Sequence, residues 1–364
     1  MLVYYILYAV TLVSMAAVAV PQSMSTRQKL ERNAYWLVCI LLCGLLALRH
    51  PTMGADLAYG QSYGYLGQFA VIAKYKWSAL YAFSKASHYE YGFILFNKLL
   101  SVFTESNQVY IAVTAIMSLV PILILLYRNS DHPFDSLLIY LGLPVFLICY
   151  SSVRQAIAVS VCTLSFEFLK KKKFWPFLLV VLFAAMFHRT AIVFAVVYPL
   201  YHLHIDKRVQ TFSILLIPLV FLLREPIFHL VSGYFRQNAV IEQTSSYTLF
   251  VVFSLIYIFT VLFGNENDPE ECGYRNLFLL VCLCQAFASI YSIAMRLGYY
   301  FMPYLPLLLD RVLQNFPHDH QRQMARWAVV GSFALFGLYS IYVSRGDWAH
   351  ASPYIFFWQS AGGG

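Results

Sequence analysis

Long apolar runs without a single charged residue constrain the fold of this chain more than any other feature. The runs Val3–Val20, Val109–Tyr127 and Trp327–Val343 contain no Lys, Arg, Asp or Glu. Such runs reach or approach the roughly 20 helical residues that cross a bilayer core. Charged residues make up 12% of the chain, against about 25% in an ordinary soluble domain. We therefore expect an all-α, polytopic membrane protein, because a soluble protein would need more polar surface.

Twelve transmembrane helices fit the apolar runs and together form a single integral membrane domain over residues 1–360. The expected spans are residues 3–20, 34–48, 108–127, 135–150, 154–169, 174–187, 190–204, 210–223, 247–263, 276–294, 297–310 and 327–343. Short cytoplasmic loops retain Lys and Arg, so the run Lys170–Lys173 marks the inner side of the membrane. Both ends of the chain then lie outside. The terminal Ala361–Gly364 is interpreted as a remnant of an expression vector.

Residues 50–107 form one long external segment in this threading. Its most apolar part, Phe93–Phe103, is interrupted by Asn97 and Lys98. We expect amphipathic, non-spanning helices near residues 77–86 and 91–103 that lie at the outer membrane surface. A half-span that dips into the protein and a thirteenth full span are the alternatives.

Apart from the lysines of that segment, every basic residue on the external side is an arginine. Arginine holds a diphosphate through a planar, bidentate fork, whereas lysine acts as a point charge. A group of arginines at the outer boundary therefore favours a site for a lipid-linked diphosphate. The alternative is that single arginines at helix ends reach the lipid headgroups. The residues concerned are Arg49, Arg154, Arg189, Arg224, Arg236, Arg296 and Arg345.

The first candidate site residues lie in the loop that follows the second span. Pro51 and Gly54 break the helix, which places Asp56 on irregular backbone close to Arg49. Tyr59 adds an aromatic face of the kind that packs against sugar rings. An interfacial tyrosine belt with a local Arg–Asp pair is the alternative.

A second candidate feature is the start of the helix expected at 154–169. Ser151 and Ser152 are suited to cap a helix that Arg154 and Gln155 open. Exposed N–H groups and an arginine at a helix N-terminus form a ready anion site. The alternative is that the serines only cap the helix and that Arg154 reaches the lipid headgroups.

Three further positions carry polar groups on the external side. Glu90 directly precedes an amphipathic helix. The alternative to a functional role is that the helix dipole favours a carboxylate at this position. His188 and Arg189 form a tight turn between two short spans, and ionisable groups at such depth are functional candidates. Arg296 lies near Tyr299 at the start of another span. No metal-binding motif accompanies these residues, so we expect neither a metal nor a cofactor.

Six short motifs, in this order, resemble the EpsG family of bacterial exopolysaccharide polymerases, which are Wzy-type enzymes. The resemblance covers nearly the whole chain. The family usually has Thr where this chain has Ala55. The motifs are Arg49 with "GAD" and Tyr59, "EYGF" (Glu90–Phe93), "SSVRQAIA" (Ser151–Ala158), "FHRTA" (Phe187–Ala191), "RLGYYF" (Arg296–Phe301) and "SPYIFFW" (Ser352–Trp358).

The resemblance implies a multi-helix fold related to the glycosyltransferase C class in the bacterial inner membrane, with its active site facing the periplasm. It also implies transfer of a growing glycan from undecaprenyl diphosphate to a sugar hydroxyl of a new lipid-linked repeat unit, without a metal. Expected partners are these lipid-linked substrates, membrane lipid, and a chain-length regulator and flippase of the same pathway, but not nucleic acid. A flippase of lipid-linked glycans, an O-antigen-ligase-like glycosyltransferase and a membrane-bound acyltransferase are the alternatives.

The chemistry implied by the resemblance assigns roles to these residues. Arginines would stabilise the departing diphosphate, and a base would accept the proton of the acceptor hydroxyl. We expect Asp56 to be the base and His188 to orient the acceptor or a phosphate, although the two roles are exchangeable. Glu90 is a further catalytic candidate. The expected substrate-binding residues are Arg49, Arg154, Gln155, Arg189, Arg296, Tyr59 and Tyr299.

Overall fold

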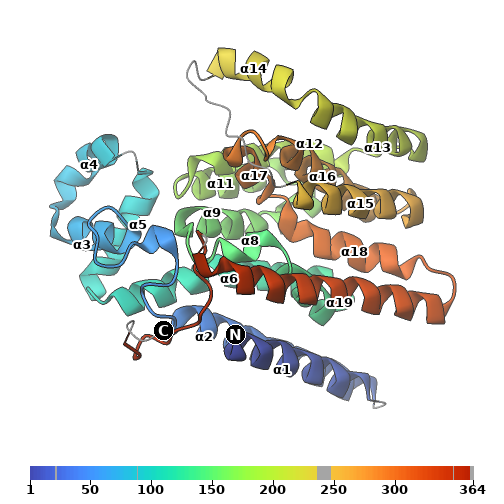
Figure 1. Ribbon diagram of the computed structural model, residues 1–364, viewed down its shortest axis with the longest axis horizontal. Coiled ribbons are helices and arrows are strands. Elements are labelled where there is room, and N and C mark those ends of the chain that lie inside the picture. The colour runs from blue at the N-terminus through green and yellow to red at the C-terminus, as the bar shows by residue number, and fades with distance from the viewer. Residues whose placement is uncertain (21–22, 88, 236–246, 347, 361–364) are drawn as a thin grey trace. The chain divides into compact units, whose positions relative to one another are not determined.

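The chain is described by a computed structural model that covers residues 1–20, 23–87, 89–235, 247–346 and 348–360 (Figure 1). It is all-helical there, with 78% of residues in helices and no β-strand in the described ranges. The chain divides into two compact units. The first unit comprises Met1–Ile192 and Val329–Gly364, and the second comprises Val193–Ala328. The predicted vector remnant, residues 361–364, lies outside the described residues.

Among the described residues, four helices are long and apolar enough to cross a membrane: α1 (Leu2–Ala19), α2 (Met24–Ala47), α6 (Asn107–Asn129) and α19 (Asp319–Val343). The last of these begins in the second unit. The protein buries 56% of the apolar window of α6 but only 22–33% of the other three. Helix α6 is thus central to the first unit, and the apolar faces of α1 and α2 are left for lipid. The Tyr35 hydroxyl ties α2 to α6 by donating to the Leu123 carbonyl at 2.9 Å.

Several predicted spans are interrupted. The span expected at 135–150 consists of α7 (Pro133–Leu141) and the short α8 (Pro144–Leu147). Pro144 lacks an N–H and disfavours helical backbone in the residue before it, so the helix stops. Gly142 allows α19 to approach at this break, because a Cβ there would lie 2.3 Å from the Phe333 carbonyl oxygen.

The spans expected at 154–169 and 190–204 are also divided, whereas the span expected at 174–187 is one helix. The span expected at 154–169 becomes α9 (Val153–Leu164) and α10 (Phe166–Lys170). It is followed by α11 (Phe174–Ala185) and the 3₁₀ helix η3 (Arg189–Val196), which continues into the second unit. The short η5 (Ser344–Gly346) follows α19.

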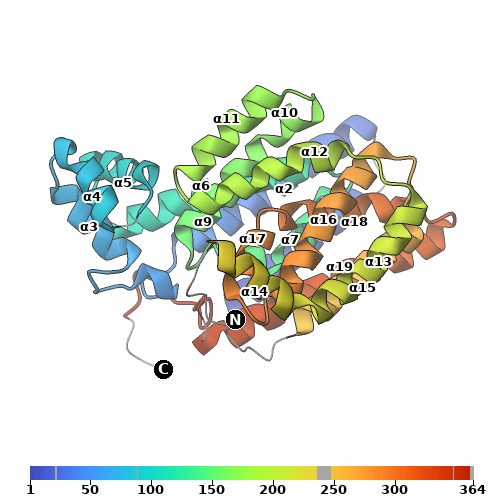
Figure 2. The same cartoon turned by 90° about the horizontal axis from the view of Figure 1, so that it is seen from above.

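The external segment contains its own small helical group. Its elements are η1 (Ala55–Leu57), α3 (Tyr65–Lys74), η2 (Trp77–Ala79), α4 (Leu80–Ser87) and α5 (Tyr91–Phe103). The helices predicted near 77–86 and 91–103 are present, whereas α3 was not predicted. Figures 1 and 2 show α3, α4 and α5 grouped at one end of α6.

The helical group has a buried apolar centre of its own, formed by Ile72, Leu80 and Ile94. The polar residues that interrupt α5 donate hydrogen bonds to backbone carbonyls. Asn97 Nδ2 donates to Phe93 at 2.7 Å, and Lys98 Nζ donates to Ala73 in the last turn of α3 at 2.7 Å. Helix α5 has 13 residues and is about 20 Å long, so it is too short for an upright span.

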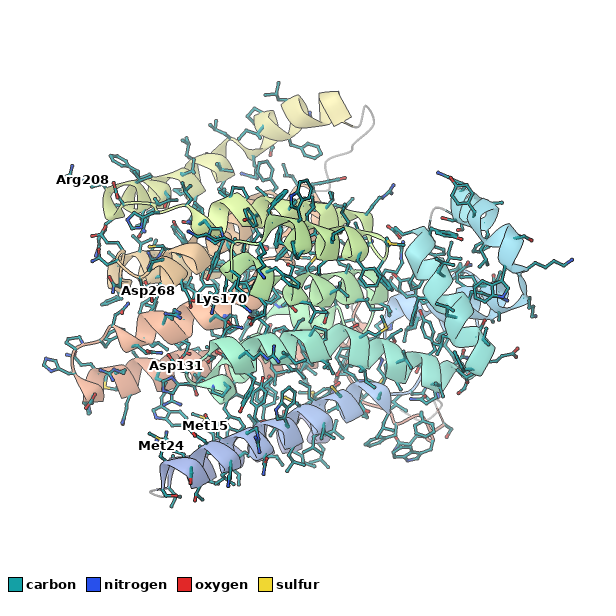
Figure 3. The ribbon with its side chains drawn as sticks, turned by 180° about the vertical axis from the view of Figure 1, so that it is seen from behind. Met15, Met24, Asp131, Lys170, Arg208 and Asp268 are labelled. Carbon is teal, nitrogen blue, oxygen red and sulfur yellow. The ribbon has the colours of Figure 1, made fainter. Side chains whose placement is uncertain are left out.

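The loops predicted to be cytoplasmic lie at the other end of the first unit. Figure 3 places Met24, Asp131 and Lys170 away from the end that carries α3–α5. Lys170 Nζ donates to Asn129 Oδ1 at 3.2 Å, which joins two of these loops. This arrangement agrees with the predicted threading of the first unit. The side of the membrane that each end faces stays a prediction.

The second unit is built from shorter helices and one bent pair. Helices α13 and α14 meet at 72° and together form either a broken span or a re-entrant loop, so the described residues contain four or five helices that could cross a membrane. The predicted number of twelve spans stays a prediction. The elements are α12 (Val197–His202), α13 (Lys207–Leu222), α14 (Arg224–Phe235), α15 (Thr248–Phe263), α16 (Pro269–Phe287), α17 (Ser292–Gly298), η4 (Met302–Tyr304) and α18 (Leu305–Gln314).

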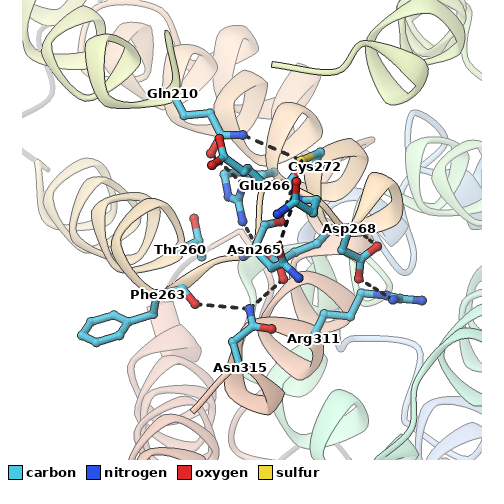
Figure 4. A network of polar contacts seen from close by, with 12 residues as sticks. Gln210, Thr260, Phe263, Asn265, Glu266, Asp268, Cys272, Arg311 and Asn315 are labelled. Carbon is cyan, nitrogen blue, oxygen red and sulfur yellow. Dashed lines mark hydrogen bonds and ion pairs between the residues drawn. The ribbon is translucent and has the colours of Figure 1, made fainter. Parts of the chain in front are cut away.

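A buried polar network joins four helix ends of the second unit (Figure 4). Arg275 and Glu271, one helical turn apart on α16, form an ion pair in which each side chain is 1% exposed. Gln210 Oε1 accepts from Arg275 Nη1 at 2.8 Å, and Asn315 Nδ2 donates to Glu271 Oε2 at 2.9 Å. Each charge thus has a neutral partner as well as its counter-ion, which offsets the cost of burial.

Candidate active site on the loops of the first unit

The loop that carries Asp56 is held against the start of α9. Gly54 has a φ of +105°, and a Cβ there would lie 1.9 Å from the Tyr150 carbonyl oxygen, so only glycine fits. This close approach lets the Asp56 N–H donate to Ser151 Oγ at 3.0 Å. Ser152 Oγ donates to Asp56 Oδ2 at 3.3 Å. The glycine of the "GAD" motif therefore positions the aspartate two residues later.

The two serines do not cap α9 as expected. Ser152 is the N-cap residue, but its hydroxyl makes no capping hydrogen bond. Both hydroxyls contact Asp56 instead, one at its backbone and one at its carboxylate. The prediction of a cap was wrong because the approaching loop offers the serines a partner that the linear sequence does not reveal.

Arg49 lies in a different environment from the one expected. Its side chain is fully buried, and its guanidinium donates to the carbonyls of Cys149 at 3.1 Å and Tyr150 at 3.2 Å. The guanidinium carbon also lies 5.1 Å from the centre of the Tyr150 ring. In this structure Arg49 fixes the turn before α9 and presents no charge to a ligand.

The C-terminal "SPYIFFW" motif clamps the same loop. Arg49 pairs with Phe356 in an isolated antiparallel bridge, and His50 N–H donates to the Ile355 carbonyl at 2.8 Å. The Ala55 N–H donates to the Trp348 carbonyl at 3.2 Å, one residue before Asp56. The C-terminal residues thus hold the loop through backbone hydrogen bonds.

Glu90 is the centre of a second cluster. Its Oε2 forms an ion pair with Arg154 Nη1. Its Oε1 accepts from the backbone N–H of Arg189 at 3.1 Å and lies 3.5 Å from His188 Nδ1. The cluster is enclosed, since Glu90, Arg154 and His188 are 11%, 20% and 19% exposed. One carboxylate therefore joins three polar groups from two other segments.

Gly92 brings these segments together. A Cβ on Gly92 would lie 2.5 Å from the Met186 Cβ and 2.8 Å from its carbonyl oxygen. The Phe93 N–H donates to that carbonyl at 3.1 Å. The "EYGF" motif therefore packs directly on the turn that carries His188, as the "GAD" motif packs on the turn before α9.

The surroundings keep Glu90 ionised. Burial opposes ionisation, but the His188 hydrogen bond, the Arg154 charge and the Arg189 N–H outweigh it. They lower the pKa of Glu90 to about 2. Glu90 is therefore an anion at neutral pH, and it neutralises part of the local positive charge.

Arg154 is held between aromatic rings as well as by Glu90. Its guanidinium carbon lies 4.5 Å from the centre of the Tyr89 ring and 5.8 Å from the centre of the Tyr65 ring. Its Nε donates to the Tyr65 hydroxyl at 3.4 Å. Such packing fixes the orientation of the guanidinium. Tyr89 was not predicted as a site residue, although it directly precedes Glu90.

The remaining predicted residues have varied surroundings. Asp56 and Arg189 are exposed, and Tyr59 is half-exposed beside the His50 ring. Gln155 is 2% exposed. Arg296 and Tyr299 belong to the second unit, so their place in a common site stays a prediction. Arg236 of the predicted arginine group lies outside the described residues.

The described residues thus define a helical membrane protein in which a carboxylate and an arginine meet on loops of the first unit. Within those residues, no group of three or more His, Cys, Asp or Glu side chains is arranged to hold a metal ion. The chain belongs to the EpsG family, a Wzy-like polymerase family whose profile matches residues 33–356. The match spans every predicted site residue. Neither the search among curated proteins nor that among solved structures returned a match.

Proposed function

We propose that this protein is a polysaccharide polymerase that transfers a growing glycan from undecaprenyl diphosphate to a sugar hydroxyl of a new lipid-linked repeat unit. The reaction takes place at the periplasmic face of the bacterial inner membrane, on a fold related to the glycosyltransferase C class. Membership of the EpsG family supports the reaction class. The Arg154–Glu90 pair supports the location, because Arg154 lies at the start of α9 and Lys170 at the end of α10, the two ends of one divided span.

The observation that carries the proposal is the cluster around Glu90. It gathers Arg154 and the Arg189 backbone from segments that are 64 and 99 residues away along the chain. A carboxylate that fixes the Arg154 guanidinium holds the remaining N–H groups of that arginine in place for an anion, without reorganisation at the moment of reaction. A departing diphosphate is such an anion, and Arg189 is exposed beside the cluster.

In the proposed reaction, the acceptor hydroxyl oxygen forms a bond to the anomeric carbon of the donor glycan. The bond between that carbon and the diphosphate oxygen breaks, and undecaprenyl diphosphate leaves with the electron pair. The hydroxyl proton passes to a base on the protein. Arg154 and Arg189 stabilise the leaving diphosphate.

Asp56 is the proposed base. Its side chain is exposed and accepts one hydroxyl hydrogen bond from Ser152, so lone pairs remain for an acceptor hydroxyl. Glu90 is engaged with Arg154, Arg189 and His188, which suits a positioning residue. His188 orients the acceptor or a phosphate oxygen, and Arg49 positions the turn before α9.

The proposal is tested by supplying the purified protein in nanodiscs with a lipid-linked repeat unit as its only substrate. A ladder of products that differ by one repeat unit is expected, and free undecaprenyl diphosphate should appear in step with each addition. Movement of intact substrate across the bilayer without any ladder would indicate a flippase. Transfer of the glycan only to a foreign acceptor lipid would indicate a ligase.

A further inference from the structure

The external helical group has a strongly biased surface. Residues 57–89 contain Lys74, Lys76 and Lys85 and no Asp or Glu. All three lysines are exposed. The same stretch contains nine Phe, Trp and Tyr residues, and the exposed ones include Tyr63 at 71%. An exposed surface that combines aromatic faces with one sign of charge is suited to an anionic ligand.

Three of these groups form a compact patch, the tyrosine–lysine patch, made of Tyr81, Lys85 and Tyr91. The rings of Tyr81 and Tyr91 meet edge to face with their centres 5.8 Å apart. Lys85 Nζ lies 5.4 Å from the centre of the Tyr81 ring. Tyr81 is 60% exposed and Tyr91 37%, so both rings offer surface to a ligand.

The patch adjoins the candidate active site. Tyr91 directly follows Glu90, and Tyr89, which precedes Glu90, packs on Arg154 at 4.5 Å. The Tyr89 hydroxyl also donates to the Tyr63 carbonyl at 3.5 Å. A ligand bound at Arg154 could therefore extend along neighbouring tyrosine rings to Lys85.

The chemistry of the patch differs from that of a bilayer contact. The opposite end of α5 exposes Leu99, Val102 and Phe103 at 54%, 62% and 85%, an apolar surface that suits lipid. Helix α4 instead exposes Tyr81, Ala82, Lys85 and Ala86, and none of these is a large aliphatic residue. Because Tyr91 and Phe103 are the first and last residues of α5, the two surfaces lie about 18 Å apart along the helix.

We propose that the tyrosine–lysine patch binds the saccharide chain of the substrate and that this saccharide carries negative charge, as a uronic acid does. The tyrosine rings pack against the faces of sugar rings, and Lys85, with Lys74 and Lys76 on the same helical group, attracts the carboxylates. This inference rests on the proposed function, since it assigns the class of glycan that the polymerase extends.

The test measures binding of two lipid-free hexasaccharides, oligogalacturonate and neutral oligogalactose, to the full-length protein in nanodiscs. The acidic sugar should bind at least about tenfold more tightly at 50 mM salt, and the difference should shrink at 0.5 M salt as charges are screened. Lys85→Ala and Tyr81→Ala should each weaken acidic binding about fivefold, the effect of roughly 1 kcal/mol. Lys85→Arg should retain most of it.

The matched control is a second exposed pair at the other end of the first unit. Lys171→Ala and Trp175→Ala remove the same kinds of group and should leave sugar binding unchanged. Equal binding of the two sugars, or equal losses in the control variants, overturns the inference. So does a result in which Lys85→Ala weakens binding only to vesicles of phosphatidylglycerol.

The inference and the proposed function fail in different ways. A protein that elongates lipid-linked repeat units but does not prefer the acidic sugar would overturn the inference and leave the function standing. A protein that binds the acidic sugar through Tyr81 and Lys85 but forms no ladder would overturn the function and keep the binding surface.

Discussion

At the scale of single residues, Glu90 holds the site together through its charge. Its folded pKa of about 2 lies below the ordinary value of 4.5, so its ionisation stabilises the protein fully above about pH 4.5. That contribution is lost as the pH falls from 4.5 towards 2. At pH 7 it amounts to about 3 kcal/mol.

Glu90→Gln should therefore lower the melting temperature of the purified protein at pH 7. The gap between wild type and variant should stay constant from pH 7 to about pH 5 and narrow below it. Thermal unfolding in detergent at a series of pH values measures this difference. A gap that is independent of pH down to pH 3 would show that the charge of Glu90 does not stabilise the fold.

A second prediction for single residues concerns which of Asp56 and His188 accepts the proton of the acceptor hydroxyl. Asp56→Asn keeps the hydrogen bond from Ser152 but removes the base, so kcat should fall by about 10²–10⁴-fold while donor binding persists. His188→Gln retains a hydrogen-bond donor and should be milder than His188→Ala. Initial rates of elongation with saturating donor give these values. Should Asp56→Asn retain most of its activity while His188→Gln loses it, the two roles are exchanged.

At the scale of elements, Gly92 determines how closely α5 packs on the turn at residues 186–189. Gly92→Ala should push α5 away from the 186–189 turn, because its Cβ would lie 2.5 Å from the Met186 Cβ. The hydrogen bond from Arg189 N–H to Glu90 would lengthen, and elongation should fall at least about tenfold because the groups around Glu90 would be misplaced. Gly44→Ala in α2 is the matched control. Nothing lies within 4 Å of its added Cβ, so activity should not change. Equal losses in both variants would contradict this account.

The elements also show what the sequence can predict. Uncharged runs predicted α1, α2, α6 and α19, because a helix that crosses lipid needs a long run of apolar residues without charges. Helix α5 was predicted with its bounds because its apolar face is regular. The interruption of the span expected at 135–150 was missed, because Pro144 stops a helix inside an apolar run and hydropathy alone does not register a break.

The candidate site was predictable as a set of motifs but not as contacts. Ionisable residues in an apolar chain identified Asp56, Glu90, Arg154 and His188 one by one. Their pairing could not be predicted, because Glu90 meets residues up to 99 positions away through backbone contacts at Gly92. The burial of Arg49 was missed for the same reason, since its partners are backbone carbonyls with no side-chain signal.

At the scale of the whole molecule, the threading predicts which ends of the first unit meet the cytoplasm. Single cysteines at Lys85 and Lys172 should label differently in intact cells, because one lies on α4 and the other in the loop beside Lys170. Lys85→Cys should react with a membrane-impermeant maleimide from outside, and Lys172→Cys only after permeabilisation. Labelling of both from outside would contradict the threading of the first unit.

The central claim is that the Glu90 cluster of this EpsG-family protein transfers glycan by stabilising a lipid diphosphate through Arg154. The most direct measurement is the initial rate of elongation of a lipid-linked repeat unit by purified Arg154→Ala, Arg154→Lys and the exposed α2 control Arg27→Ala. The account predicts a loss of about 30- to 1000-fold for Arg154→Ala, partial recovery in Arg154→Lys because the planar fork is lost, and no loss for Arg27→Ala. Elongation by Arg154→Ala at the wild-type rate, with equal amounts of folded protein, would contradict it.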